Sequence, residues 1–368
     1  MNAVMIAALG LAALTGSFSV VWFVRVFAGR YLLDIPNARS SHIRPTVRGG
    51  GVGIVVVAWF GWAVIALRYN ITVPIWPLVG ASFLVATISV IDDLRSLPSS
   101  IRFGFHALAA VIIIWGYDAP NMIMLPLYGS ANIPSPASVL ILVFWCLALT
   151  NVYNFMDGID GIAGIQAIIA SLGWTFAGLS LGEPLLAGTG IVLMAASLGF
   201  LFHNWAPARI FLGDVGSAFL GFCFAALVAV AGDVGAGTIP VAAVLFVWPF
   251  VFDGTFTLVR RILRGENIFQ AHRSHLYQRQ VISGRSHAQT ATLYGALAAL
   301  SVAAGCVWIL KVPGAGAIAV GVAIAEALCL LVVTVRCEAK RREYMEQAAN
   351  SGVAKESSVV PPVEIPVS

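Results

Sequence analysis

Charged residues are scarce in this chain. Of its 368 residues, 10% are Asp, Glu, Lys or Arg and 59% are hydrophobic, whereas an ordinary soluble domain carries roughly 25% charged residues. A soluble globule of this size could not cover its surface with so few ionisable groups. The composition excludes a soluble globular protein and favours one that lies in a lipid bilayer.

Cysteine motifs and internal repeats are also missing. None of the five cysteines forms a CxxC pair or a zinc-like cluster, which excludes a disulfide framework and a structural zinc site. We interpret them as small packing residues. Without a visible internal repeat, the inverted-repeat architecture of many transporters has no support.

Long apolar runs are what the sequence does contain. About 20 residues of helix cross the hydrocarbon core of a bilayer, and these runs do not alternate as barrel strands would. We predict an all-α polytopic membrane protein with about eleven transmembrane helices. The predicted spans are 3–24, 50–68, 74–91, 103–117, 137–153, 161–181, 185–203, 211–231, 237–257, 290–310 and 314–335.

The positive charges predict the orientation of these spans. No Lys or Arg precedes Arg25, so the first run is expected to be a retained anchor rather than a signal peptide. With the N-terminus outside, every one of the 21 Lys and Arg residues except Arg68 and Lys311 is cytoplasmic. We predict one transmembrane catalytic domain over 1–336. Residues 337–368 would form a cytoplasmic tail, charged and helix-like at first but largely disordered.

Five acids lie at the predicted cytoplasmic ends of spans. Acids at membrane depth are costly and usually mark a functional site or a buried pair. Asp92 and Asp93 are adjacent, and a divalent cation or a shifted pKa would relieve their repulsion. The alternative is a helix-capping acid with an ion-pair partner in Arg95 or Arg102. The five acids are Asp92, Asp93, Asp157, Asp160 and Asp214.

Two further segments combine acids with glycine or asparagine. Asn151, Asn154 and Asp157 recur every three residues and would line one side of a helix, where amides suit uracil or sugar hydroxyls. A helix end with a DG turn explains one acid of this segment but not both acids and both asparagines. Asp214 stands between glycines at a helix start, where it could cap the helix or serve as a hard oxygen ligand for Mg²⁺. Asn204 lies just upstream and supplies a further polar contact.

Two loops are rich in arginine, histidine or glycine. Residues 271–279 read AHRSHLYQR, and arginines bind phosphate in bidentate fashion. A basic loop beside anionic lipid headgroups is the alternative, which leaves the histidines unexplained. In the first loop, the run RGGGVG from Arg48 would leave backbone N–H groups free to hold an anion.

These motifs, in the order RGGG, DD, NxxNFMDGIDG, FLGDxGS and a His-rich loop, resemble the polyprenyl-phosphate N-acetylhexosamine-1-phosphate transferase family (glycosyltransferase family 4). The resemblance covers roughly residues 30–280. It implies transfer of an N-acetylamino-sugar 1-phosphate from a UDP-sugar to undecaprenyl phosphate, with release of UMP. It also implies Mg²⁺ as cofactor, with Mn²⁺ acceptable to the same ligand types, and a location in the bacterial inner membrane with the active site facing the cytoplasm. No nucleic-acid partner is expected, and a homodimer is one option for its assembly.

The resemblance also assigns roles to residues. It implies catalytic roles for Asp92, Asp93, Asp157 and Asp160, and metal binding by Asp214 and Asp93. The implied substrate-binding residues are Arg48, Gly49, Gly50, Asn151, Asn154, Asn204, His272, Arg273, His275 and Arg279.

Two departures from the family pattern bear on the branch. Ser96 stands where the last acid of a DDxxD motif often lies, and HRSHLYQR replaces a run of adjacent histidines. The second feature resembles the O-antigen-initiating branch, whose donors include UDP-N-acetylfucosamine and UDP-N-acetylquinovosamine, with UDP-GlcNAc as another candidate. The peptidoglycan and teichoic-acid branches are the alternatives within the family.

Two rival interpretations come from other classes of protein. A cation-coupled transporter would place acids at the bilayer midplane, where Glu326 is the clear candidate. Asp253 lies near a cytoplasmic end, and pairing with Arg260 or Arg261 would explain it. A catalytically inactive scaffold is disfavoured because every motif keeps its ionisable residues.

Overall fold

The protein is a bundle of long helices in the computed structural model, which describes residues 1–28, 32–34, 45–69, 71, 74–235, 237–267, 270 and 272–350. Arg39, His42 and Arg44 of the first loop, Ala271 and the tail from 351 lie outside the described residues. The helices are α1 (Ala3–Phe23, continuing as a π-helix over Val24–Ala28), α2 (Gly51–Arg68), α3 (Trp76–Arg95), α4 (Ser99–Tyr117), α5 (Ser135–Met156), α6 (Ile162–Leu181), α7 (Pro184–Asn204), α8 (Gly213–Ala231), α9 (Ile239–Phe246), α10 (Trp248–Leu263), α11 (Leu276–Ile282), α12 (His287–Ile309) and α13 (Ala315–Asn350).

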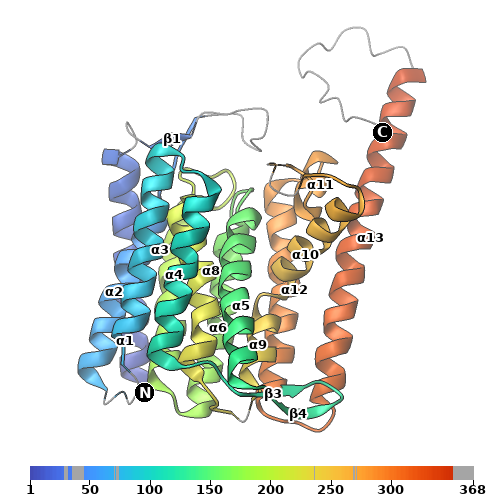
Figure 1. Cartoon of the computed structure of the whole chain (residues 1–368). Helices are drawn as coiled ribbons and strands as arrows, with labels where there is room; N and C mark the ends of the chain where they lie inside the picture. The colour runs from blue at the N-terminus through green and yellow to red at the C-terminus, as the bar shows by residue number, and fades with distance from the viewer. Residues whose placement is uncertain are drawn as a thin grey trace.

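Ten of the described helices are long and apolar enough to cross a membrane, and the bent pair α9 and α10 brings the number to as many as eleven. The expected multi-pass all-α membrane fold is confirmed. Large apolar side chains on the outer helices face outward, as lipid contact requires. The start of α1 and the end of α13 lie at opposite ends of the bundle (Figure 1).

The ninth predicted span differs from the structure, because it is broken rather than continuous. Helices α9 and α10 meet at Val247 with a bend of 78°. Pro249 lies in the first turn of α10 and has no N–H to donate to the preceding turn, so one straight helix cannot continue through it. The break turns α10 toward the short helix α11.

The last span continues into the charged tail as one helix. Helix α13 continues to Asn350, about four turns beyond the expected end of the span at 335. Residues 336–350 are therefore helical, as expected for the charged first part of the tail. Just before these residues α13 packs beside α11, where Gln280 Nε2 donates to Thr334 Oγ1 at 3.1 Å.

Two small antiparallel sheets occupy the opposite ends of the bundle. Strands β1 (Leu33–Asp34) and β2 (Thr46–Val47) pair just before α2, and Val47 forms a parallel bridge with Ile210 before α8. Strands β3 (Met122–Leu125) and β4 (Gly129–Asn132) form a hairpin at the other end (Figure 1). The sequence pattern did not predict this hairpin, because its strands are only four residues long.

Helix α8 is the centre of the bundle, and every one of its residues except Asp214 is buried. Helix α8 packs against α2, α3 and α5. Polar residues at or next to the ends of these three helices lie near the first turn of α8. We call this end, which carries β1 and α11 in Figure 1, the site end.

Candidate active site

Asp93 joins the end of α3 to the start of α8. Its Oδ1 accepts from the N–H of Asp214 and its Oδ2 from the N–H of Val215, both at 3.1 Å. The first N–H groups of a helix lack partners within the helix, and a carboxylate satisfies them well. Gly213 makes the approach possible, since a Cβ there would lie 2.8 Å from Asp93 Oδ2 and its φ is +76°.

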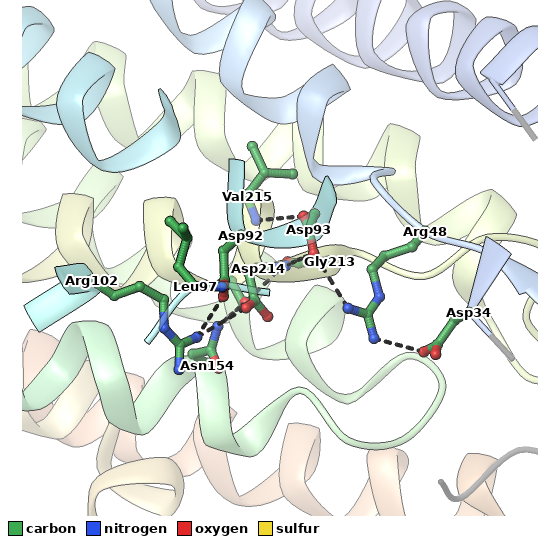
Figure 2. A network of polar contacts seen from close by, with 11 residues as sticks. Asp34, Arg48, Asp92, Asp93, Leu97, Arg102, Asn154, Gly213, Asp214 and Val215 are labelled. Carbon is green, nitrogen blue, oxygen red and sulfur yellow. Dashed lines mark hydrogen bonds and ion pairs between the residues drawn. The ribbon is translucent and has the colours of Figure 1, made fainter. Parts of the chain in front are cut away.

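Asp92 and Asp214 lie side by side, and one arginine contacts both of them (Figure 2). Arg102 Nη1 contacts Asp92 Oδ2 at 2.7 Å and Asp214 Oδ2 at 3.1 Å. The N–H of Leu97 donates to the other oxygen of Asp92. The alternative that Asp92 pairs with Arg102 is thus confirmed, but the same guanidinium also brings Asp92 to Asp214, which is 122 residues further along the chain.

Arg48 lies on the other side of Asp93. Its guanidinium is 3.6 Å from Asp93 Oδ1 and 2.8 Å from Asp34 Oδ2 (Figure 2). Burial lowers the pKa of Arg48, but the hydrogen bond to Asp34 and the nearby carboxylates outweigh this and raise it overall. We call Asp92, Asp93 and Asp214 with Arg48 and Arg102 the acid cluster.

The glycines that follow Arg48 have a packing role. The N–H of Gly50 donates to Phe211 O at 2.9 Å and that of Gly51 to Leu212 O at 2.8 Å. The sequence had suggested that these amides could bind an anion, but both are hydrogen-bonded within the protein. Instead α2 and α8 touch backbone to backbone, and a Cβ on Gly51 would lie 2.2 Å from the Cα of Gly216.

Asn154 of α5 approaches the acid cluster from a third helix. Asn154 Nδ2 donates to Ser217 Oγ at 3.1 Å, and the Asn154 side chain also hydrogen-bonds to Asp214. Asn151, one turn earlier, donates to Leu147 O at 2.7 Å. The expected shared face is confirmed for the two asparagines on α5, but the helix ends at Met156.

Asp157 and Asp160 follow α5 and lie in different surroundings. Burial raises the pKa of Asp157 well above its usual value, and the negative charge of Asp214 raises it further. Asp160 Oδ2 accepts from Ala208 N at 3.1 Å and lies 3.3 Å from His287 Nδ1. His287 begins α12, far along the chain, so sequence spacing gave no signal of this contact.

Residues 272–279, the His loop, pack against the segment that carries Asp157. The rings of His272 and His275 lie 5.0 Å apart, and His275 is only 4% exposed. Burial lowers the pKa of His272 to about 4, with nearby His275 and arginines adding to the shift, so its ring is neutral near pH 7. Tyr277 Oη donates to Phe155 O at 2.9 Å.

Arg279 and Asn204 bind protein groups that the sequence did not predict. Arg279 makes a bidentate ion pair with Glu338 of α13, at 2.8 and 2.9 Å. Asn204 accepts from the N–H of Gly161 and donates to Ile210 O, both at 2.9 Å. In this structure Arg279 joins α11 to α13, and Asn204 joins the loop before α6 to the loop before α8. Either side chain would have to leave these partners to contact a substrate.

Comparison with known proteins places this arrangement in a family. Residues 75–232 match glycosyl transferase family 4. The chain is 30% identical over 315 residues to a decaprenyl-phosphate N-acetylglucosaminephosphotransferase of Mycobacterium tuberculosis (strain H37Rv), and the match covers 77% of each chain. The chain belongs to glycosyl transferase family 4.

Two further members show the breadth of the family. A probable undecaprenyl-phosphate N-acetylglucosaminyl 1-phosphate transferase of Bacillus subtilis is 28% identical over 257 residues, which cover 69% of this chain and 71% of the relative. A phospho-N-acetylmuramoyl-pentapeptide-transferase of Synechococcus elongatus is 31% identical over 249 residues, which cover 60% of this chain and 63% of the relative. The family-level resemblance noted in the sequence is confirmed, and the protein is a transferase.

The acid cluster has the donor chemistry of a magnesium site. Mg²⁺ is usually held by one or two carboxylates, while waters and substrate phosphates supply the remaining oxygens. Asp92 and Asp214 offer such a pair, and Arg102 shows that a single cation can contact both of them. No group of three or more His, Cys, Asp or Glu side chains within the described ranges could hold a metal by itself. The residues therefore fit an ion that shares its coordination with a substrate, rather than a closed structural site.

Asp253 has partners other than those expected from the sequence. Its expected partners bind elsewhere, since Arg260 donates to Ser274 O at 3.0 Å and Arg261 lies 3.3 Å from Glu266. Pairing of Asp253 with either arginine is therefore wrong. Asp253 instead binds the start of α11, because the break at Val247 directs α10 toward the His loop.

Proposed function

We propose that this protein transfers an N-acetylamino-sugar 1-phosphate from a UDP-sugar to undecaprenyl phosphate and releases UMP. The names of its relatives support this reaction, because the mycobacterial and Bacillus proteins are described as polyprenyl-phosphate N-acetylglucosamine phosphotransferases. The observation that carries the proposal is the acid cluster, in which the Asp92 and Asp214 carboxyl groups face one Arg102 cation. Such a cluster suits a reaction between two phosphorylated anions, whose main demand is charge neutralisation.

The proposed reaction is a displacement at phosphorus. An oxygen of the lipid phosphate attacks the β-phosphorus of the UDP-sugar and forms a new diphosphate bond. The bond from that phosphorus to the bridging oxygen breaks, and this oxygen leaves with UMP. The attacking phosphate is already largely ionised near pH 7, so a strong base is not required.

The partly exposed members of the acid cluster are the groups we assign to the substrates. The side chains of Arg48, Arg102 and Asp214 are 36%, 31% and 28% exposed, whereas those of Asp92 and Asp93 are 7% and 4% exposed. The two arginines would orient phosphate oxygens. Both oxygens of Asp93 hold the start of α8, so Asp92 is the acid of the pair that we assign to the reaction, and its low exposure favours contact with the lipid phosphate through a bound cation.

We assign Mg²⁺ binding to Asp214 and to Asp92 in place of Asp93, because both oxygens of Asp93 accept from the start of α8. These ligands would also accept Mn²⁺. A bound ion would offset negative charge on the diphosphate of the donor. Asn154 contacts Asp214 and Ser217 and would keep Asp214 oriented toward that ion. Asp157 and Asp160, on the segment between the acid cluster and the His loop, would contact the donor.

We also propose that the site faces the cytoplasm of a bacterial inner membrane, with the N-terminus outside. Within the described residues the positive charges concentrate at the site end, as expected for a cytoplasmic face. The product would begin an O-antigen or another envelope polysaccharide. The transporter alternative depends on Glu326, which accepts from Ser301 Oγ at 2.7 Å and so joins α12 to α13.

A donor panel tests the reaction. Purified protein in lipid nanodiscs would receive undecaprenyl phosphate, Mg²⁺ and one of UDP-GlcNAc, UDP-N-acetylfucosamine, UDP-N-acetylquinovosamine or UDP-MurNAc-pentapeptide, with UMP release as the readout. We expect release that depends on the lipid phosphate, with the first three donors preferred. Release only from the pentapeptide donor would move the protein to the peptidoglycan branch, and no release from any donor would contradict the proposal.

A further inference from the structure

Asp253 is a fully buried acid on α10 that meets the start of α11. Its Oδ1 accepts from Leu276 N at 2.8 Å and lies 3.3 Å from His275 Nδ1. Its Oδ2 accepts from Tyr277 N at 3.1 Å. One carboxylate therefore binds three consecutive residues of the His loop.

The same carboxylate is also held from two other directions. Tyr294 Oη of α12 donates to Oδ2 at 2.6 Å, and Thr257 Oγ1 of α10 donates to Oδ1 at 3.1 Å. A buried carboxylate is costly unless hydrogen bonds replace its lost water. Because a carboxylate only accepts, these contacts place a proton on Nδ1 of His275 and leave Nε2 as its other functional atom.

The His loop in turn meets the segment that follows α5. The rings of His275 and Phe155 lie 6.5 Å apart, and Tyr277 Oη donates to Phe155 O. A Cβ on Gly158 would lie 2.1 Å from Tyr277 Oη, so this contact requires a glycine. The position of His275 is therefore coupled to the backbone beside Asp157.

We propose that Asp253 is a positioning residue, which orients His275 and fixes the His loop against residues 155–158 so that the loop can bind the diphosphate of the donor. This inference rests on the proposed function, because it assigns the His loop to the UDP-sugar. It predicts that Asp253 governs the affinity for the UDP-sugar and has little influence on the lipid phosphate, which meets the acid cluster.

The test is a double-mutant cycle between Asp253 and His275. In Asp253→Asn the size is kept, but one oxygen becomes an NH₂ group that faces donors, so the loop loses its fixed position. We expect the KM for the UDP-sugar to rise about 10- to 100-fold, by analogy with the loss seen when the hydrogen-bond partner of a metal-binding histidine is removed. The KM for undecaprenyl phosphate should stay within about twofold of wild type, a selectivity that general destabilisation would not produce.

The second arm of the cycle is His275→Gln, alone and combined with Asp253→Asn. If Asp253 acts through His275, the double variant should be no more than about twofold worse than His275→Gln alone. Glu326→Gln is the matched control, because it also replaces a buried acid of the bundle, and we expect it to leave both KM values unchanged. A wild-type KM in Asp253→Asn, an equal rise in both KM values, or effects that multiply in the double variant would overturn the proposal.

A milder variant covers the case in which Asp253→Asn does not fold. Tyr294→Phe removes one donor and keeps the carboxylate, and we expect a rise of about threefold in the KM for the UDP-sugar that disappears in the His275→Gln background. A wild-type KM for the UDP-sugar in Tyr294→Phe alone would overturn the proposal.

The inference remains testable if the proposed function is wrong. A wild-type protein that releases no UMP would contradict the function alone. Hydrogen exchange of the amides of 272–282, measured without substrate, should be faster in Asp253→Asn than in wild type. Unchanged exchange would overturn the positioning role whatever the reaction.

Discussion

The acid cluster and Asp253 use carboxylates in opposite ways. In the cluster, Asp92, Asp93 and Asp214 share two arginines, and Asp214 is 28% exposed. Asp253 is completely buried, and each of its oxygens is satisfied by donors from the protein itself. A cluster with more acids than arginines can bind a metal ion and a substrate. A carboxylate whose oxygens are fully hydrogen-bonded within the protein can only hold the chain in place.

This contrast explains why both regions lie at one end of the bundle. The cluster supplies the charge that a phosphoryl transfer needs, and Asp253 supplies a fixed position for the His loop beside it. Asp157 is linked to both regions, because burial and then the negative charge of Asp214 raise its pKa, and the next residue, Gly158, packs against Tyr277 of the His loop. The two regions should therefore respond differently to substitution.

Asp214→Asn should have the largest effect on activity. It removes a charge from the acid cluster with little change in shape, and we expect UMP release to fall by about 10³-fold or more. Asp92→Asn and Asp93→Asn should also abolish transfer, although for Asp93 we expect part of the loss to come from a weakened start of α8. Near-normal turnover in all three variants, at wild-type protein levels, would contradict the assignment of the site.

Gly216→Ala and Gly51→Ala should have the largest effect on folding. Each added methyl group would overlap the facing helix, since a Cβ on Gly51 lies 2.2 Å from the Gly216 Cα. Overpacking of this kind costs about 1–3 kcal/mol, and thermal unfolding in detergent should show a lowered midpoint. Gly80→Ala is the matched control, because a Cβ on this glycine of α3 meets nothing within 4 Å. Equal stability of Gly51→Ala and Gly80→Ala would contradict the close contact of α2 with α8.

Arg102→Met should separate the role of the cation from that of the acids. Asp92 and Asp214 would lose their shared partner and repel one another, so a divalent cation should bind more tightly. We expect UMP release to fall about 10- to 100-fold while the apparent Kd for Mg²⁺ decreases, measured by calorimetry. Arg95→Met, at an exposed position near the same helix end, serves as the control. An unchanged or weaker Mg²⁺ affinity would show that the ion does not bind between these two acids.

Glu338→Gln should have the smallest effect. Its ion pair with Arg279 is partly exposed, and such pairs contribute about 0–1 kcal/mol. We expect UMP release within about threefold of wild type and a similar result for Arg279→Gln. A large loss in Arg279→Gln with full activity in Glu338→Gln would instead support the original interpretation of Arg279 as a phosphate clamp.

Local features of the sequence were enough to predict the bundle. The apolar runs gave the spans, because hydropathy depends on neighbouring residues alone, and the acids at span ends indicated one polar face. Pro249 was a readable signal for the break between α9 and α10, although the 78° bend depends on tertiary packing.

Contacts between distant segments could not be predicted in the same way. Neither the proximity of Gly51 to Gly216 nor the binding of Asp253 to the His loop follows from sequence spacing. Asp93 is the clearest example of a contact that the sequence did not predict. Its pairing with Asp92 indicated a charged site, but only the structure shows that its oxygens cap α8.

The fate of the β-phosphate tests the central claim most directly. Purified protein in nanodiscs would be given undecaprenyl phosphate, Mg²⁺ and UDP-GlcNAc labelled with ³²P at the β-position, or another donor that the panel shows to be active. We predict that the label enters the lipid fraction with the wild-type protein, that unlabelled UMP is released, and that Asp214→Asn leaves the label in the UDP-sugar. Label that stays out of the lipid with every donor, or enters it equally with Asp214→Asn, would contradict the assignment of sugar-phosphate transfer to the acid cluster.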